Sequence, residues 1–351
     1  MLYYLYMSIR VGINGFGRIG RAFFRLAWEE EEVEVVAIND LGNAENFAYL
    51  LKHDSVYRAF HEEVYAEGDK LVVGGKEIKF LGERDPSKLP WGDLDVDIVV
   101  ESTGIFDSYK KARAHLDGGA RRVVITAPVK DDDPNGATVL MGVNEEKFNT
   151  CEITSNASCT TNAASPLIAI LDEKVGIEKA LLNTVHSYTA TQSLVDSPVK
   201  GSDFRRGRSA AMNMVPSSTG AAVAVTKAYE NLVDKFDGIA VRVPTPAGSI
   251  ADITFIAKRE TTAEEINHIL EEASKEDRWK GVFTVTKEPL VSSDIIGNTH
   301  GAIADLSLTR VVGGNLVKVM SWYDNEMGYA NTLLRHVVEA GLATQAGKHS
   351  K

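Results

Sequence analysis

Cysteine is scarce in this chain. The 351 residues contain only two cysteines, Cys151 and Cys159, which are too few for a disulfide framework and have no partner at zinc-finger spacing. We therefore expect no metal site. So few cysteines also fit a reducing compartment, and we expect a cytoplasmic protein.

Long apolar runs and an excess of positive charge are absent as well. No run approaches the roughly 18 residues that a membrane-spanning helix needs, so we expect no membrane partner. The chain has 38 Lys and Arg against 49 Asp and Glu, a net charge of −11, which argues against nucleic acid as a partner. Any anion that binds must meet a local cluster of basic residues.

The first seven residues, MLYYLYM, are apolar, but this stretch is too short for a signal peptide or a membrane span. Met7 is an alternative start. We therefore interpret residues 1–7 as an extension that precedes the first strand.

The rest of the composition is that of a globular protein, with 44% hydrophobic and 25% charged residues. The length predicts two domains. In the first half, short β-branched runs alternate with helix-like stretches, which predicts an α/β fold with a doubly wound, mostly parallel sheet of the Rossmann type. Residues 65–80, which contain a pair of glycines, predict an inserted hairpin.

The pattern changes at about residue 180. Longer strand-like runs alternate there with two helix-like stretches, residues 219–233 and 262–274, which predicts an α+β domain with a mixed or antiparallel sheet. The apolar periodicity of residues 329–340 predicts a C-terminal helix.

A glycine motif, N-G-F-G-R-I-G, follows the first predicted strand. In such a G-x-G-x-x-G pattern, Gly15 allows the tight turn, Gly17 lets the backbone approach a pyrophosphate, and Gly20 lets the helix pack on the strand. The pyrophosphate would lie at the helix N-terminus. A glycine turn can also serve packing alone, so the motif by itself does not decide between these roles.

Asp40 strengthens the interpretation of a dinucleotide site. It ends the second predicted strand, twenty residues after Gly20, where a carboxylate accepts hydrogen bonds from the adenosine ribose and repels a 2′-phosphate. Leu41 follows in place of a small polar or basic residue. Together they predict NAD rather than NADP.

Cys159 is the candidate nucleophile. It stands at the start of a predicted helix, residues 160–171, where the dipole and free amides stabilise a thiolate. The same amides could hold an oxyanion on a carbonyl that the sulfur attacks. We assign the commoner role of cysteine, a small buried hydrophobe, to Cys151.

His186 is the candidate acid and base, because it closes a strand-like run and opens a polar loop. Sequence separation alone does not pair it with Cys159. We interpret the other histidines as surface or structural residues: His53, His61, His115, His268, His300, His336 and His349.

Three arginines lie close together in the sequence, which is unusual in a chain with a net charge of −11. Arg205, Arg206 and Arg208 precede a polar loop, residues 216–221, that starts a predicted helix, a setting that suits phosphate. Arg242 lies inside an apolar strand and needs an anionic partner. A structural salt bridge is the alternative for each arginine, but together they favour a phosphorylated substrate.

Seven stretches of the chain match one family in order, and the chain resembles the phosphorylating glyceraldehyde-3-phosphate dehydrogenases. The stretches are INGFGRIGR, SNASCTTN, TVHSYTATQ, RRGRSAA, VPSSTGAA, VRVPTP and WYDNEMGY. They extend over nearly the whole chain. The resemblance departs at Ala163, where a second cysteine is common, and it places Ser197 and Pro198 in a loop that reaches a neighbouring subunit.

The resemblance implies an NAD-dependent enzyme that converts glyceraldehyde 3-phosphate and inorganic phosphate to 1,3-bisphosphoglycerate through a cysteine thioester, in a homotetramer. Cys159 would be the nucleophile and His186 the base. The implied substrate-binding residues are Ser158, Thr160, Thr189, Arg206, Thr219, Gly220 and Arg242. The implied cofactor-binding residues are Gly15, Phe16, Gly17, Arg18, Ile19, Gly20, Asp40, Leu41, Ser102, Thr103, Gly104, Asn325 and Tyr329.

These expectations define a cofactor domain, residues 8–158, completed by a C-terminal helix at 325–345, and a catalytic domain, residues 159–324. Two alternatives stay open at this point. An erythrose-4-phosphate dehydrogenase would share the fold, the cysteine and the histidine. A silent NAD-binding protein on the same fold would have no need of an activated thiol.

Overall fold

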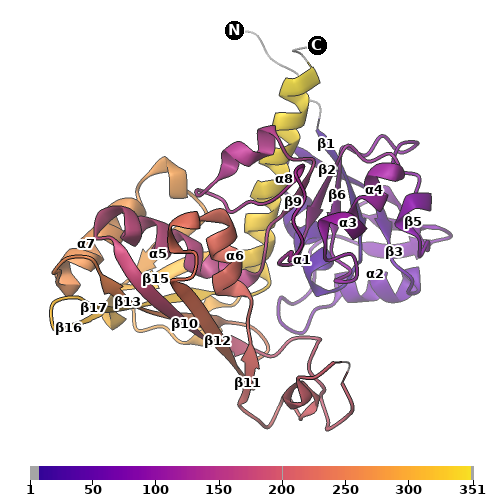
Figure 1. The fold of residues 1–351 in the computed structure, drawn as a ribbon. Coiled ribbons are helices and arrows are strands. Elements are labelled where there is room, and N and C mark those ends of the chain that lie inside the picture. The colour runs from indigo at the N-terminus through magenta and orange to yellow at the C-terminus, as the bar shows by residue number, and fades with distance from the viewer. Residues whose placement is uncertain (1–7, 200, 349–351) are drawn as a thin grey trace. The chain divides into compact units, whose positions relative to one another are not determined.

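The computed structural model describes residues 8–199 and 201–348, with side chains to residue 345 (Figure 1). The predicted extension at residues 1–7 and His349 lie outside the described residues. The chain divides into two compact units. Unit 1 comprises the chain up to Val139, Glu145–Ala157 and the chain from Leu333, while unit 2 comprises Leu140–Asn144 and Ser158–Thr332.

Unit 1 is built on a sheet that contains nine strands among the described residues, in the order β3-β4-β5-β2-β1-β6-β7-β9-β8. The strands are β1 (Ile9–Asn14), β2 (Val33–Asn39), β3 (Val64–Glu67), β4 (Lys70–Val73), β5 (Lys76–Leu81), β6 (Ile98–Glu101), β7 (Arg122–Ile125), β8 (Gly136–Thr138) and β9 (Ile153–Ser155). All neighbours are parallel except in β3-β4-β5. The predicted hairpin is therefore three strands, the last of which joins β2.

Helices connect the parallel strands of unit 1, because a parallel pair needs a crossover rather than a tight turn. They are α1 (Arg18–Ala27), α2 (Ala44–Lys52), α3 (Tyr109–Ala112) and α4 (Ala114–Asp117). The chain winds from β1 to β2 on one side and returns to β6 on the other. The order thus reverses between β1 and β6, which is where doubly wound sheets bind ligands.

Unit 2 contains a mixed sheet, in the order β11-β12-β10-β13-β17-β15-β14, with β16 paired to β17. The strands are β10 (Ile177–Ser187), β11 (Val215–Ser218), β12 (Phe236–Val243), β13 (Ser249–Ala257), β14 (Phe283–Thr286), β15 (Ala302–Asp305), β16 (Arg310–Val312) and β17 (Leu316–Tyr323). β10 runs parallel to β12 and antiparallel to β13. The structure therefore has the predicted fold class in both halves.

The helices of unit 2 are α5 (Cys159–Lys174), α6 (Ala221–Ala228) and α7 (Ala263–Ala273), and Figure 1 shows α5 and α6 beside the sheet. From α5, Leu167, Ile168 and Leu171 are fully buried in one core with Leu182 and Phe255 from the strands. This apolar packing fixes the start of α5, with Cys159 at its first residue, relative to the end of β10.

The sequence overestimated one helix of unit 2. Residues 219–233 were expected to be helical, but α6 ends at Ala228 and a separate 3-10 turn follows at Glu230–Leu232. The expected polar loop before it is in part a strand, since β11 pairs with β12 at the sheet edge. Pro216 is tolerated there because an edge strand does not need every N–H donor.

The C-terminal helix, α8 (Met327–Lys348), is longer than the predicted residues 329–340. Among the described residues, no helix is long and apolar enough to cross a membrane. Short 3-10 helices also occur at Pro86–Lys88, Glu145–Asn149, Phe204–Gly207, Asp277–Trp279, Ser292–Ile295 and Leu306–Leu308.

Candidate active site

Cys159 is the first residue of α5, as expected. Ser158 caps the helix by accepting a hydrogen bond from Thr161 N–H at 3.2 Å. Ala157 turns the chain into the cap with φ +53°, a left-handed conformation that costs a non-glycine residue about 1 kcal/mol. Cys159 as a whole residue is intermediate in burial at this helix N-terminus.

His186 meets Cys159 although the sequence could not pair them. Its Nε2 atom lies 3.3 Å from Cys159 Sγ, and only 2% of the residue is exposed. The ring of Tyr323 packs edge-on against the imidazole with centroids 5.8 Å apart. The Tyr323 hydroxyl lies 2.8 Å from the hydroxyls of both Thr160 and Thr184. Through these two contacts, Tyr323 of β17 connects α5 with β10 next to the catalytic candidates.

Arg242 stands beside the histidine because β10 and β12 are parallel and in register, which pairs His186 with Arg242. Arg242 Nη1 lies 2.6 Å from His186 Nδ1 and 3.1 Å from the carbonyl oxygen of Ser187. In the described part of the chain no carboxylate pairs with this half-buried guanidinium. A cation in such a place favours an anionic ligand.

Burial and the charge of Arg242 shift the pKa values of Cys159 and His186. Burial raises the pKa of the Cys159 thiol, against the charge of Arg242 and a hydrogen bond from the Thr160 amide. Burial, and then the charge of Arg242, lower the pKa of His186 to about 3. The helix start thus favours the thiolate as expected, but burial outweighs it. Burial thus favours the neutral forms of both the thiol and the imidazole.

A second group of anion-binding candidates follows β10. Thr189 and Thr191 share a hydroxyl contact at 3.0 Å, and Arg206 reaches Thr191 Oγ1 at 3.4 Å and Ser217 Oγ at 3.1 Å. Thr219 Oγ1 accepts a hydrogen bond from the Ala221 amide at 3.2 Å. Gly220 is the N-cap of α6. Arg206 thus connects a hydroxyl after β10 with a hydroxyl of β11, and its guanidinium also pairs with Asp203 at 3.2 Å.

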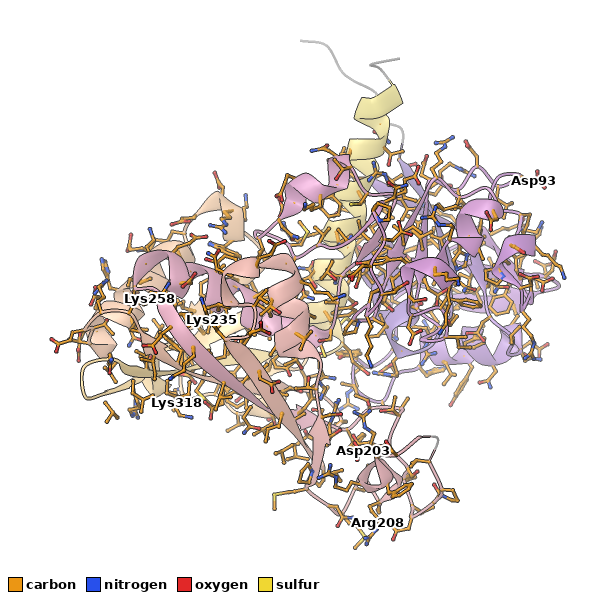
Figure 2. All side chains as sticks on the ribbon, in the orientation of Figure 1. Asp93, Asp203, Arg208, Lys235, Lys258 and Lys318 are labelled. Carbon is orange, nitrogen blue, oxygen red and sulfur yellow. The ribbon has the colours of Figure 1, made fainter. Side chains whose placement is uncertain are left out.

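The other two arginines of the predicted cluster belong to the surface. Arg205 pairs with Asp203 and Arg208 with Asp196, with both arginine side chains more than 60% exposed. Figure 2 shows Asp203 and Arg208 in the segment between β10 and β11. Arg206 Nε also lies 3.2 Å from Asp203 Oδ2. All three arginines of the cluster therefore have the salt bridge that the alternative expected, and Arg206 differs in being less exposed.

The glycine loop of unit 1 lines a cavity of about 490 Å³ at the point where the strand order reverses. Of the predicted cofactor residues, this cavity brings together Gly15, Gly17, Asp40, Leu41, Ser102 and Thr103. Asp40 Oδ2 accepts the Phe16 amide at 2.8 Å. The carboxylate therefore both shapes the loop and faces the cavity.

The loop fits a pyrophosphate on steric grounds. Gly15 has φ +95° and a Cβ there would meet Thr103 N at 2.6 Å, while a Cβ on Gly20 would meet Gly15 O at 2.2 Å. A Cβ on Gly17 would meet no protein atom within 4 Å. Packing thus requires Gly15 and Gly20, whereas Gly17 keeps space open at the start of α1, where free amides attract an anion.

Other predicted cofactor residues are not among those that line this cavity. Arg18 Nη1 contacts Asp54 Oδ2 at 2.5 Å, and Gly104 has φ +70° in the loop after β6. In unit 2, Asn325 is buried with Oδ1 accepting from Ser249 Oγ at 3.0 Å, and Tyr329 is buried in α8. Ile19 lies in the first turn of α1.

Sequence reasoning missed several residues around this cavity. Asn39, Glu83, Arg84, Ile105 and Phe106 also line it. Glu83 and Arg84 follow β5, which is parallel to β2 and therefore ends at the same sheet edge. The sequence analysis interpreted residues 65–80 as a hairpin, in which the last strand has no parallel neighbour. It therefore did not predict that Glu83 and Arg84 lie at the edge of the sheet where β2 ends.

A buried polar network beneath the loop was also missed. Glu101 Oε2 lies 2.5 Å from Asn14 Nδ2 and 3.0 Å from His115 Nε2. Trp91 Nε1 donates to His115 Nδ1 at 3.0 Å, so the histidine carries its proton on Nε2 and donates it to Glu101. Glu101 Oε1 also accepts the Thr103 amide at 2.8 Å. Both oxygens of the Glu101 carboxyl group therefore have hydrogen-bond donors. The group connects Asn14 with Thr103, and both of these residues line the cavity.

Comparison with known proteins assigns the family. Residues 9–109 match the family model described as glyceraldehyde 3-phosphate dehydrogenase, NAD binding domain, and residues 158–325 match the C-terminal domain of the same family. The chain belongs to this family. Its first matched domain identifies NAD as the cofactor.

Full-length relatives agree. The chain is 47% identical to the glyceraldehyde-3-phosphate dehydrogenase of Priestia megaterium over 96% of this chain and all of that protein. It is 51% identical to that of Thermotoga maritima over 93% of this chain and 97% of that protein. These names do not favour the erythrose-4-phosphate alternative. In the described part of this family member, no group of three or more His, Cys, Asp or Glu could hold a metal.

Proposed function

We propose that this protein oxidises glyceraldehyde 3-phosphate with NAD and inorganic phosphate to give 1,3-bisphosphoglycerate in the cytoplasm. The observation that carries the proposal is the contact between Cys159 Sγ and His186 Nε2 at a helix start, beside Arg242, which has no carboxylate partner among the residues that the structure describes. A thiol, a base and a cation in one place suit attack on the aldehyde of a phosphorylated substrate.

Substrate binding would use the cations and hydroxyls of unit 2. Arg242 and Thr189 would hold the phosphate of the aldehyde. Ser158, Thr160, Thr219 and Gly220 would hold the attacking inorganic phosphate, with Arg206 available to either anion. The Thr160 hydroxyl already contacts Tyr323, so it would offer an anion its remaining hydrogen-bonding capacity.

Catalysis would begin when His186 takes the thiol proton and Cys159 attacks the aldehyde carbon. The free amides at the start of α5 would stabilise the oxyanion of the hemithioacetal. NAD, when bound, accepts the hydride that leaves this carbon. Cys159 then holds the acyl group as a thioester, which phosphate attacks, and the thiolate leaves as the acyl phosphate forms.

Cofactor binding would use the cavity of unit 1. Asp40 would accept hydrogen bonds from the adenosine ribose, and the amides that follow Gly15 would hold the pyrophosphate. Ser102, Thr103 and Gly104 would line the cofactor on the β6 side. Asn325 and Tyr329 would serve the nicotinamide end, as the family resemblance implies.

An absorbance assay tests this function. The purified protein should form NADH from NAD and glyceraldehyde 3-phosphate only when inorganic phosphate or arsenate is present. Erythrose 4-phosphate should be a much poorer substrate. NADH formation at an equal rate without phosphate would contradict the acyl-phosphate product.

We further propose that the protein is a homotetramer. Leu181 on β10, Ile239 on β12 and Leu316 on β17 are 66%, 57% and 43% exposed in the single chain. Strand pairing places all three on the same face of the sheet of unit 2. Exposed large apolar side chains on one sheet face are typical of a protein interface. Light scattering should give a tetramer, and Leu181→Glu combined with Ile239→Glu should give smaller species.

A further inference from the structure

Three adjacent parallel strands of unit 1 end in buried polar side chains. The last residues of β2, β1 and β6 are Asn39, Asn14 and Glu101, and each of them is at most 4% exposed. Strand register places Asn14 directly between the other two residues. Because burying a polar group is costly unless it is hydrogen-bonded, these three side chains need partners at the sheet edge.

The three side chains belong to one continuous chain of hydrogen bonds. Asn14 Nδ2 donates to Glu101 Oε2 at 2.5 Å, and Asn39 Nδ2 donates to Asn14 Oδ1 at 2.7 Å. Asn39 also bonds both backbone groups of Glu83, because Nδ2 donates to the carbonyl oxygen at 2.8 Å and Oδ1 accepts from the amide at 2.9 Å. At the other end, Glu101 Oε1 accepts from the amide and the hydroxyl of Thr103. The chain therefore connects the backbone after β5 with the backbone after β6.

The Glu101 carboxylate fixes the direction of this chain. A carboxylate only accepts hydrogen bonds, so the amide nitrogen of Asn14 must face it. Asn14 Oδ1 then faces Asn39 Nδ2, which leaves Asn39 Oδ1 for the Glu83 amide. A side-chain amide at position 101 would present a donor to Asn14 and favour reversal of both asparagines. Asn39 Nδ2 would then face the Glu83 N–H, donor against donor.

Both ends of the chain belong to the lining of the cofactor cavity. Residues 83–84 line it after β5, and Thr103 and Ile105 line it after β6. Thr103 Oγ1 also accepts from the Ile105 amide at 3.1 Å, so the chain continues into that loop. Asp40 follows β2, which lies between β5 and β6 in the sheet. The adenosine that Asp40 would hold therefore lies between two segments that the chain joins.

We propose that Glu101 is a positioning residue for the cofactor, and that it acts through Asn14 and Asn39. The chain holds the segments after β5 and β6 at the separation that the adenosine half of NAD requires. This rests on the proposed use of the cavity by NAD. Glu101 is 2% exposed and does not line the cavity, so it acts on affinity through the chain. A preorganised site binds more tightly because less conformational freedom is lost on binding.

Equilibrium binding to the full-length protein tests the proposal. Glu101→Gln should weaken the binding of NAD and of AMP by the same factor of about ten, which corresponds to about one hydrogen bond. The KM for glyceraldehyde 3-phosphate should not change. Isothermal titration well below the unfolding temperature measures both affinities. An unchanged affinity for NAD, or a loss for NAD without a loss for AMP, overturns the proposal.

A double-mutant cycle tests whether the effect passes along the chain. Asn39→Ala should also weaken NAD binding, and adding it to Glu101→Gln should cause little further loss, because either change breaks the same chain. Additive losses would show two separate roles and would overturn the proposal. If Glu101→Gln does not fold, Thr103→Val takes its place in the cycle, since it removes a hydroxyl that donates to the same carboxylate.

Thr154→Val separates positioning from general stability. Thr154 Oγ1 lies 2.7 Å from His336 Nε2, and both residues are buried in unit 1 outside the cavity lining. This variant should lower the unfolding temperature and leave the affinity for NAD unchanged. A loss of NAD affinity equal to that of Glu101→Gln overturns the proposal. Because binding is measured without turnover, this proposal can fail while the NADH assay succeeds.

Discussion

The Nε2 atom of His186 lies 3.3 Å from the Sγ atom of Cys159, across a sequence separation of 27 residues. The contact exists because α5 packs on the sheet of unit 2, which places the first residue of α5 beside the end of β10. Burial favours the neutral forms of both side chains, since it raises the pKa of the thiol and lowers that of the imidazole.

Cys159→Ser should lower phosphate-dependent NADH formation by on the order of a thousandfold or more, because a hydroxyl is a far weaker nucleophile than a thiolate. Cys151→Ser is the matched control. Cys151 is buried in unit 1, so this variant should keep most of its activity. Substantial activity in Cys159→Ser would rule out the thiol mechanism.

His186→Asn should lower kcat by about 10²- to 10⁴-fold, the usual contribution of a positioned acid and base. The KM for NAD should change little, because His186 is not one of the residues that line the cofactor cavity. Steady-state kinetics with each substrate varied in turn checks this. An unchanged kcat would remove His186 from the reaction.

Asp40→Ala should raise the kcat/KM ratio of NADP to NAD, because it removes the charge that repels a 2′-phosphate. It should also weaken NAD binding, since the Phe16 amide loses its partner. Asp69→Ala, outside the cavity lining, is the control. If the ratio stays the same in Asp40→Ala, the carboxylate does not face the ribose.

Glu101→Gln should destabilise unit 1 by about 1–3 kcal/mol, because a side-chain amide has one accepting oxygen in place of two and leaves buried donors of the network unsatisfied. The matched control is Glu77→Gln, in an exposed pair with Lys70, which should cost less than about 1 kcal/mol. Thermal unfolding of both variants measures the difference. If the two variants lost equal amounts of stability, the buried network around Glu101 would not support the glycine loop.

Acid should destabilise the protein through two buried histidines. Burial lowers the pKa values of His186 and His336 to about 3, below the ordinary value near 6.5. Their neutral forms therefore stabilise the fold above about pH 6.5, and this contribution is lost as the pH falls toward 3. In this pH range, each of the two histidines should lower the free energy of unfolding by about 1.4 kcal/mol for every pH unit of acidification. His336→Phe should flatten the acid slope of the unfolding temperature; an unchanged slope would contradict this origin.

The sequence by itself determined the α/β class, the glycine loop, Asp40 and the start of the helix at Cys159. Each of these depends on local patterns: strand and helix periodicity, a turn that only glycine allows, and a residue at a strand end. The strand at β11 was missed, because pairing with β12 overrides the local preference of residues 215–218. The end of α6 at Ala228 was missed as well, since a 3-10 turn replaces the last part of the predicted helix.

Only the tertiary structure decided which residues meet. Strand register put Arg242 opposite His186, and packing of α5 put Cys159 beside that histidine. It also left Arg206 less exposed than Arg205 and Arg208, although all three pair with carboxylates, and it brought Glu101, His115 and Trp91 together beneath the glycine loop. These contacts join residues far apart in sequence, and their distances and burial set the charges that the proposed chemistry uses.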